Sequence, residues 1–559
     1  MKKTNWLLLV LALVLSMFLA ACSGGDDTSG SSDDSSDSSS DGEASPDSEQ
    51  VLNLYDTAEI PTMDSSLATD AVAFQFLGST MDGLYRLGEG AEAEPGIATE
   101  HEVSEDGLTW TFTLREDAVW SNGDPVTAND FVYAWQRAVN PDTASEYGPY
   151  MMSGVIKNAE AIAAGDTPVE DLGVKADGDY TLTVELEKPI PYFESLTTFG
   201  TFLPLNQKFV EEQGDQYALE ADTLVYNGPF VMTEWNHGEG WTLEKNEDYW
   251  DAENVKLDTI NVKVVKDTAT AVNLYETGEV DRVNLSSEFV DQYQTSEEFG
   301  VKEEPTLFYL KMNQENEILG NVNARKAIQM AIDRQSMVDV ILNNGSIPAV
   351  GDIPAKFANH PESGEDFRDI NGDLIEYNLD EAQKLWSTAK EELGQDTLEL
   401  EYLGGDTEVA KQMDAYIKDQ LEKLEGLTVN VTSVPFKERL ERDTSMNYEL
   451  QNSGWGPDYI DPNTFLNMWV TDGGNNMTGY SSEEYDALIE KANNELALEP
   501  VERFEAFLEA EKLLIQEDAV LAPLYQRAQA QLYKPYLKGV IVNPMGPDYT
   551  YKYAYIEGK

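Results

Sequence analysis

The chain has 559 residues and a formal net charge of −67 at pH 7, because 104 Asp and Glu outnumber 37 Lys and Arg. A surface this acidic excludes nucleic acid as a partner and disfavours direct contact with an anionic membrane surface, since both need basic groups. One cysteine excludes an internal disulfide, and the length predicts two or three domains.

The chain opens with a secretory signal peptide. Lys2 and Lys3 supply positive charge, and the apolar run 6–21 is shorter than the roughly 20 residues that a transmembrane helix needs. The run ends in Leu19-Ala20-Ala21-Cys22, which resembles a bacterial lipobox. The resemblance implies that 1–21 is removed and that Cys22 carries acyl chains such as palmitate. These would hold the protein on the outer face of the cell membrane of a Gram-positive bacterium.

Residues 22–50 are predicted to be a disordered tether. The segment has nine acidic residues, no basic ones and almost no apolar ones, so it cannot bury enough surface to fold. The signal peptide carries +2 and the tether −9, which leaves −60 for residues 51–559. Such a charge repels itself unless salt screens it, and we therefore expect a saline or alkaline habitat.

The folded body begins with strand signals. Val51–Tyr55 is predicted to be a strand, and residues 108–114 and 180–186 alternate apolar and polar side chains in the way that half-buried strands do. Thr127, with Asp130 three residues later, predicts the start of a helix over the following turns, which Pro141 ends.

The second half of the body is more helical. A short strand is predicted at residues 427–432. Apolar faces of 3.6-residue period predict helices over 323–342, 380–393, 409–424, 482–496 and 501–516. The layout is mixed α/β with at least two lobes, and clefts between lobes are where ligands usually bind.

The sequence predicts no catalysis, no metal and no cofactor. The three histidines are far apart, and the HExxH, G-x-S-x-G and Walker A motifs are absent. His237 lies in Trp235–Trp241, which is typical of a hairpin turn. Asp369–Asp373 resembles a calcium loop, but its glycine precedes the last aspartate instead of following it, so we interpret it as an acidic surface turn.

Residues 454–466 are the most informative segment. Gly454 and Gly456 flank Trp455, and Asp458 and Tyr459 follow. Glycines let another backbone approach closely, and the aspartate adds a charge. Taken alone, the segment also fits an edge strand and a turn that pack Trp455 into the core.

This segment resembles the ligand-site motif of the oligopeptide-binding proteins of ABC importers, which are extracytoplasmic solute-binding proteins of family 5 or cluster C. The resemblance covers nearly all of the body. Matching runs lie at 114–115, 120–127, 130–137, 143–145, 227–230, 325–328 and 331–334. It implies a periplasmic-binding-protein-like α/β fold of type II, with three lobes and a ligand cleft between lobes.

The resemblance also implies roles for individual residues. Asp458 would pair with the α-ammonium of a peptide, and the backbone of Gly454–Gly456 would bond the peptide main chain as an added strand. The remaining candidates come from the same motif or from matching segments: they are Tyr459, Trp455, Glu59, Ile60, Tyr147 and Tyr150. For all of these except Tyr459, packing in the core is the alternative role.

One feature departs from the family pattern. Relatives that grip the carboxylate of short peptides use basic side chains upstream of the G-W motif, but those places fall here at Asn452 and near Asp443. Phe436 falls where an aromatic residue is usual. We therefore expect no fixed peptide length.

The family architecture implies three lobes with these boundaries: 51–69, 201–303 and 525–559 for lobe I, 70–200 for lobe II, and 304–524 for lobe III. Lobes I and III would close on the ligand by a hinge motion.

The sequence therefore predicts a monomeric, lipid-anchored receptor that captures oligopeptides outside the cell and delivers them to an ABC permease. A receptor for a peptide pheromone and a receptor of the same fold for a nickel complex, haem or a sugar are alternatives. A secreted peptidase or chaperone is the enzymatic alternative, which the sequence disfavours.

Overall fold

The computed structural model describes residues 49–559, apart from residues 407 and 474 and a few side chains, which are those of Ala91, Glu408, Phe436, Lys437 and Leu440. The predicted signal peptide, Cys22 and the tether up to residue 48 lie outside the described residues. None of the helices within the described part is long and apolar enough to cross a membrane.

Gln50, which the predicted tether included, belongs to the folded body. Its side chain is buried, its Nε2 donates to the Ile556 carbonyl at 2.9 Å, and its Oε1 accepts from the Ile556 N–H at 2.9 Å. Both ends of the amide are thus satisfied by the backbone of the last strand, so the fold begins before residue 51.

The first sheet has four strands in the order β1-β10-β9-β8, with β1 parallel to β10 and the other pairs antiparallel. The hairpin predicted around His237 is confirmed, since it joins β8 to β9. Gly240 has φ 149°, and a Cβ there would lie 2.0 Å from the Val262 carbonyl oxygen. The strands are β1 Val51–Asp56, β8 Phe230–Asn236, β9 Gly240–Lys245 and β10 Thr259–Val264.

The second sheet is antiparallel, in the order β4-β5-β7-β6. Both alternating segments form strands, and the apolar side chains of Phe112, Leu182 and Val184 are fully buried. α3 begins with the predicted capping box of Thr127 and Asp130. The elements are β4 Ala98–Val103, β5 Thr109–Leu114, β6 Val174–Ala176, β7 Thr181–Glu185 and α3 Ala128–Val139.

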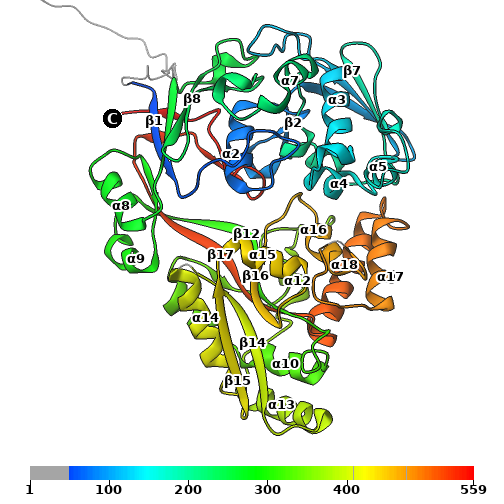
Figure 1. The fold of residues 1–559 in the computed structure, drawn as a ribbon, viewed down its shortest axis with the longest axis vertical. Helices are drawn as coiled ribbons and strands as arrows, with labels where there is room; N and C mark the ends of the chain where they lie inside the picture. The colour runs from blue at the N-terminus through cyan, green and yellow to red at the C-terminus, as the bar shows by residue number, and fades with distance from the viewer. Residues whose placement is uncertain (1–48, 407, 474) are drawn as a thin grey trace, which may run out of the picture. The chain divides into compact units, whose positions relative to one another are not determined.

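The third sheet is built on two long antiparallel strands, β12 and β17, which run side by side in Figure 1. Their register shifts between Glu303 and Leu307. On one side of this shift β17 also pairs with β11, and on the other side β12 pairs with β16. The strands are β11 Arg282–Asn284, β17 Leu521–Tyr533, β12 Phe299–Met312, β16 Leu450–Trp455, β14 Leu398–Gly405 and β15 Leu427–Val434, with β13 Ile347–Pro348 beside β17.

Helices cover both faces of this sheet. Adjacent residues of β12 point to opposite faces, so Leu310 packs with α10, α13 and α14, whereas Tyr309 packs with α12, α16, α17 and α18. α8 and α9 form a smaller core with β11. The bounds are α8 Thr268–Glu276, α9 Ser287–Tyr293, α10 Val322–Ala331, α12 Phe367–Asn371, α13 Leu379–Leu393, α14 Glu408–Leu421, α16 Asn463–Leu466, α17 Glu483–Asn493 and α18 Pro500–Lys512.

Two local predictions were wrong. The single helix predicted over 323–342 is broken, because Ile332 is extended and the Asp333 carboxylate caps a new turn by accepting from the Ser336 N–H at 3.0 Å. The acidic turn predicted at Asp369–Asp373 is for the most part helix α12, and no cluster of potential metal ligands occurs among the described residues.

The remaining elements are short. The helices are α2 Ala71–Thr80, α4 Tyr147–Met152, α5 Ala159–Ala163, α6 Phe193–Leu196, α7 Gln207–Gln213, α11 Arg334–Ser336 and α15 Phe436–Thr444. Three two-stranded sheets pair β2 Tyr85–Leu87 with β3 Ala93–Pro95, β18 Leu537–Lys538 with β21 Tyr555–Ile556, and β19 Ile541–Val542 with β20 Tyr549–Thr550.

Candidate ligand-binding site

The strand that carries the G-W motif has a partly open edge. β16 pairs with β12 along its whole length, but with β14 only at Leu450 and Gln451. From Asn452 to Trp455 no described strand pairs with this second edge. An edge of this kind offers N–H and C=O groups to an added strand.

Gly454 has a packing role of its own. It lies opposite Phe308 of β12, and a Cβ at this position would come within 2.9 Å of the phenyl ring. Phe308 in turn stacks on Tyr525, with ring centroids 4.8 Å apart. Gly456 is less confined, since its nearest neighbour would be Thr306 Oγ1 at 3.3 Å. The first glycine is thus required by the sheet itself.

Asp458 is a buried carboxylate without a cationic partner among the described residues. It is 7% exposed. Its Oδ2 accepts a hydrogen bond from the Tyr150 hydroxyl at 2.8 Å, and its backbone N–H donates to Thr464 Oγ1 at 3.1 Å. Burial raises the pKa of the Asp458 carboxyl to about 7, although the bond from Tyr150 opposes this shift. A ligand cation next to the carboxylate would offset the free-energy cost of ionising it in this buried place.

Tyr150 and Trp455 stand beside this carboxylate. Their ring centroids are 6.3 Å apart at an angle of 84°. Trp455 is fixed by its Nε1, which donates to the Thr464 carbonyl at 2.9 Å. The Tyr150 residue as a whole is 39% exposed. Its hydroxyl group, however, is desolvated and lies next to the Asp458 carboxylate, and both effects raise the pKa of the Tyr150 hydroxyl, so this group remains a hydrogen-bond donor. Tyr147 contacts Tyr150 in an edge-to-face arrangement and stacks on Phe199.

Tyr459 joins this segment to a distant part of the chain. Its ring stacks on Tyr192 with centroids 4.2 Å apart, and Asn463 Nδ2 donates to both hydroxyls at 3.2 and 3.0 Å. The Ile460 N–H donates to Ser195 Oγ at 3.3 Å. Residues 150–196 and 455–463 therefore meet at Asp458.

The Glu59 and Ile60 side chains lie elsewhere. Ile60 is buried in the core beside the first sheet. Glu59 Oε1 contacts His237 Nδ1 at 2.6 Å, and this bond raises the pKa of the His237 imidazole. Neither side chain joins the group around Asp458, and the predicted backbone contact of this segment with a ligand stays a prediction.

Cationic groups lie upstream of the motif although Asn452 and Asp443 are not basic. Arg439 Nη1 donates to the Asn452 carbonyl at 2.6 Å, and Lys311 Nζ contacts both oxygens of Asp443, at 2.8 and 3.0 Å. Phe436 begins α15, and its side chain lies outside the described residues. Asn452, Arg439 and Gly454 line a cavity of about 180 Å³ beside the open edge.

Sequence reasoning missed Thr464, which contacts Asp458, and several residues that line the cavities near the motif. Thr464 was within the motif but carried no sign of its two hydrogen bonds. Tyr192 and Lys188 lie far from the motif in sequence, and 271 positions separate Tyr192 from Asn463, so no local pattern could have linked either residue to the motif. Arg439 could have been noticed, since it precedes Asp443 by one helical turn in α15.

A buried, uncompensated carboxylate beside an open strand edge, where two distant segments meet, is typical of a binding protein for a cationic, extended ligand. The comparisons agree with this class. The family described as bacterial extracellular solute-binding proteins, family 5 (middle), matches residues 92–477, and the chain belongs to this family. The family predicted from the G-W motif is thereby confirmed.

Individual relatives support the same assignment. The chain is 33% identical over 537 residues to the dipeptide-binding protein DppE of Bacillus subtilis (strain 168), with 96% of each chain covered. It is 46% identical to the substrate-binding domain of an oligopeptide ABC transporter from Bacillus anthracis str. Ames, at a TM-score of 0.82, covering 92% of this chain and 99% of that one. Listeria monocytogenes OppA bound to peptide shows 44% identity and a TM-score of 0.81 over 91% of this chain and 99% of that chain. The predicted α/β fold of type II is confirmed.

The cost of the buried carboxylate leads to a stability prediction. In the unliganded protein at pH 8, Asp458→Asn should raise the free energy of unfolding by about 1 to 4 kcal/mol, because burial raises the pKa of the Asp458 carboxyl to about 7 and the folded protein must hold the carboxylate ionised at pH 8. The gain should vanish below about pH 4, where the carboxyl is protonated both folded and unfolded, and grow as pH rises to 7.

Urea unfolding at pH 4 and pH 8, after removal of any bound ligand, measures this difference. Asp166→Asn, at an exposed carboxylate, is the control and should change stability by less than about 0.5 kcal/mol. A variant at residue 458 that is less stable than the wild type at pH 8 would show that the carboxylate is not strained by burial.

Proposed function

We propose that this protein captures oligopeptides outside the cell and delivers them to an ABC permease. The observation that carries the proposal is Asp458, a buried carboxylate that follows β16 closely in the chain and has no cation beside it among the described residues, together with the edge of β16 that is unpaired from Asn452 to Trp455. Every peptide with a free N-terminus supplies one ammonium and a backbone that can pair with a strand edge. A receptor that uses only these two features accepts many sequences.

Delivery depends on closure of the lobes. We propose the boundaries expected from the family, with lobe II as residues 70–200 and lobe III as residues 304–524. The register shift of β12 between Glu303 and Leu307 supports the boundary before lobe III. Among the described strands, residues of β12 before the shift pair only with β17, toward the end of β17 that also pairs with β11, whereas residues after the shift also pair with β16. Irregular strand positions of this kind can absorb changes in backbone angles.

The attachment to the membrane is part of the same proposal. Cleavage before Cys22, lipidation of this residue with acyl chains such as palmitate, and a tether of acidic and serine residues would hold a monomeric receptor near its permease on the outer face of the cell. The chain acts by binding and not by catalysis. Support comes from the lipobox-like sequence and from a family of extracellular solute-binding proteins.

Native mass spectrometry of residues 49–559 tests the cargo. We expect a ladder of adducts at peptide masses, or uptake of peptides from an added library of free N-termini. A single defined non-peptide mass, or a protein that takes up no member of the library, would contradict the peptide assignment while leaving the family membership intact.

A further inference from the structure

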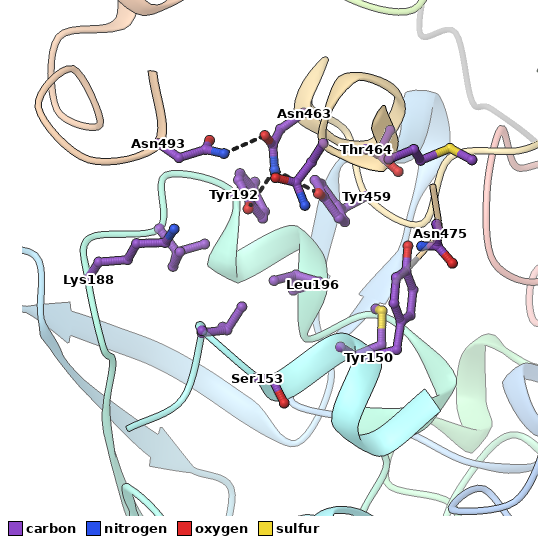
Figure 2. Close-up of a pocket in the computed structure, with 16 residues that line it drawn as sticks. Tyr150, Ser153, Lys188, Tyr192, Leu196, Tyr459, Asn463, Thr464, Asn475 and Asn493 are labelled. Carbon is purple, nitrogen blue, oxygen red and sulfur yellow. Dashed lines mark hydrogen bonds between the residues drawn. The ribbon is translucent and has the colours of Figure 1, made fainter. Parts of the chain in front are cut away.

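A cavity of about 130 Å³ lies between residues 150–196 and 459–493 (Figure 2). Two of its lining residues contact Asp458 directly, since the Tyr150 hydroxyl donates to the carboxylate and Thr464 Oγ1 accepts from its N–H. A cavity of 150 Å³ can hold a benzene-sized guest, so this space suits one medium side chain. A ligand bound to the Asp458 carboxylate is therefore close to Tyr150 and to this cavity.

Lys188 is the one charged residue among those that line the cavity in the described part of the chain, and Figure 2 shows it at the opposite side from Tyr150. The polar groups around the space are otherwise neutral, including Ser153, Asn463, Asn467, Asn475 and Asn493. The chain has 104 acidic residues, yet none of those described lines this cavity. The lining of the cavity is thus positively charged, whereas the protein as a whole is strongly negative.

Lys188 also lacks an ion pair with any described residue. Its side chain is half-buried, and burial, together with the nearby Arg503, lowers the pKa of its ammonium. Arg503 is itself neutralised, because it donates to both oxygens of Asp461 at 2.6 and 2.8 Å. Glu490, the acidic group that acts on Lys188, is exposed on α17 and not in ion-pair contact.

We propose that this cavity receives a side-chain carboxylate of the bound peptide, with Lys188 as its counter-ion, so that the protein favours peptides with Asp or Glu among their first three residues. The inference rests on the proposed function, since the bond of the peptide ammonium to Asp458 brings these residues to the cavity. The peptide carboxylate supplies an ion-pair partner to the half-buried ammonium of Lys188, whose desolvation is otherwise uncompensated.

Calorimetry with alanine pentapeptides tests the proposal. Each peptide carries one Glu or one Gln at position 1, 2 or 3 and has a free N-terminus. At one of these positions the wild type should bind the Glu peptide about five- to twentyfold more tightly than the Gln peptide. Lys188→Met should reduce this ratio to below about twofold and leave the affinity for the Gln peptide within about twofold.

Two variants control for indirect effects. Lys188→Arg should keep the preference, and Lys175→Met, which removes a lysine exposed on the surface, should not change it. Equal affinity of Glu and Gln peptides for the wild type, or a preference that survives Lys188→Met, would overturn the inference while peptide binding stands.

The carboxylate could also be the C-terminal one, so each peptide is compared with its C-terminal amide. A Lys188-dependent loss on amidation, with no Glu preference, would overturn the side-chain assignment. Failure of every peptide to bind would overturn both this inference and the proposed function.

Discussion

Replacing Asp458 by asparagine should weaken the binding of a pentapeptide with a free N-terminus by at least about 30-fold, or about 2 kcal/mol. Asparagine keeps the shape and can still accept from the Tyr150 hydroxyl, so the variant removes the charge alone. The peptide ammonium would then be desolvated without a counter-ion, and breaking one side of a buried charge pair costs about 2 to 5 kcal/mol. Isothermal calorimetry measures the loss.

Asp352→Asn is the matched control. Asp352 is 1% exposed, accepts from Trp469 Nε1 at 3.1 Å, and has a carboxyl pKa that burial raises. It lies in the core of the third sheet's helices and not at the cleft, so its substitution should leave peptide affinity unchanged. Equal affinity of Asp458→Asn and wild type for the peptide would remove Asp458 from the site.

Peptide affinity should depend steeply on pH below 7. Because burial raises the pKa of the Asp458 carboxyl to about 7, the carboxyl of the free protein is mostly protonated at pH 6, whereas the ammonium-bound form requires the carboxylate. At pH 7 the carboxyl is about half protonated, so affinity should fall by about fivefold between pH 7 and pH 6 and by nearly a further tenfold between pH 6 and pH 5. The peptide α-amino group, with a pKa of about 8, stays charged over this range.

Calorimetry at these three pH values, in buffers of different ionisation enthalpy, gives both the affinity and the number of protons released on binding. Asp414 also has a pKa raised to about 6 by burial and lines the cavity at Arg439, so Asp458→Asn is measured in parallel. The peptide affinity of the Asp458→Asn variant should be nearly independent of pH. An equal pH dependence in the variant would assign the effect to another group.

Local sequence rules accounted well for the separate elements. The capping box at Thr127, the alternation in β5 and β7 and the hairpin at His237 each depend on residues close together in the chain. The break after Ala331 did not follow from periodicity, because the apolar pattern continues through it. The competing signal is Asp333, a capping residue inside an apparently continuous helix.

The environment of the motif was harder to predict than the motif. Asp458 could be singled out because it follows the G-W pair, but its burial and its raised pKa depend on Tyr150, which is 308 residues away in sequence. Lys188 follows a strand in an ordinary loop, and only the fold places it across a cavity from Tyr150. Contacts across the chain of this kind have no periodic signature.

The most direct test of the account combines Asp458→Asn with acetylation of the peptide's N-terminus in a calorimetric cycle. We predict that acetylation weakens binding to the wild type by at least about 30-fold and binding to Asp458→Asn by less than about threefold, because the two changes remove partners of the same ion pair. An acetylated peptide that binds the wild type as tightly as the free peptide would contradict the recognition of the N-terminal ammonium by Asp458.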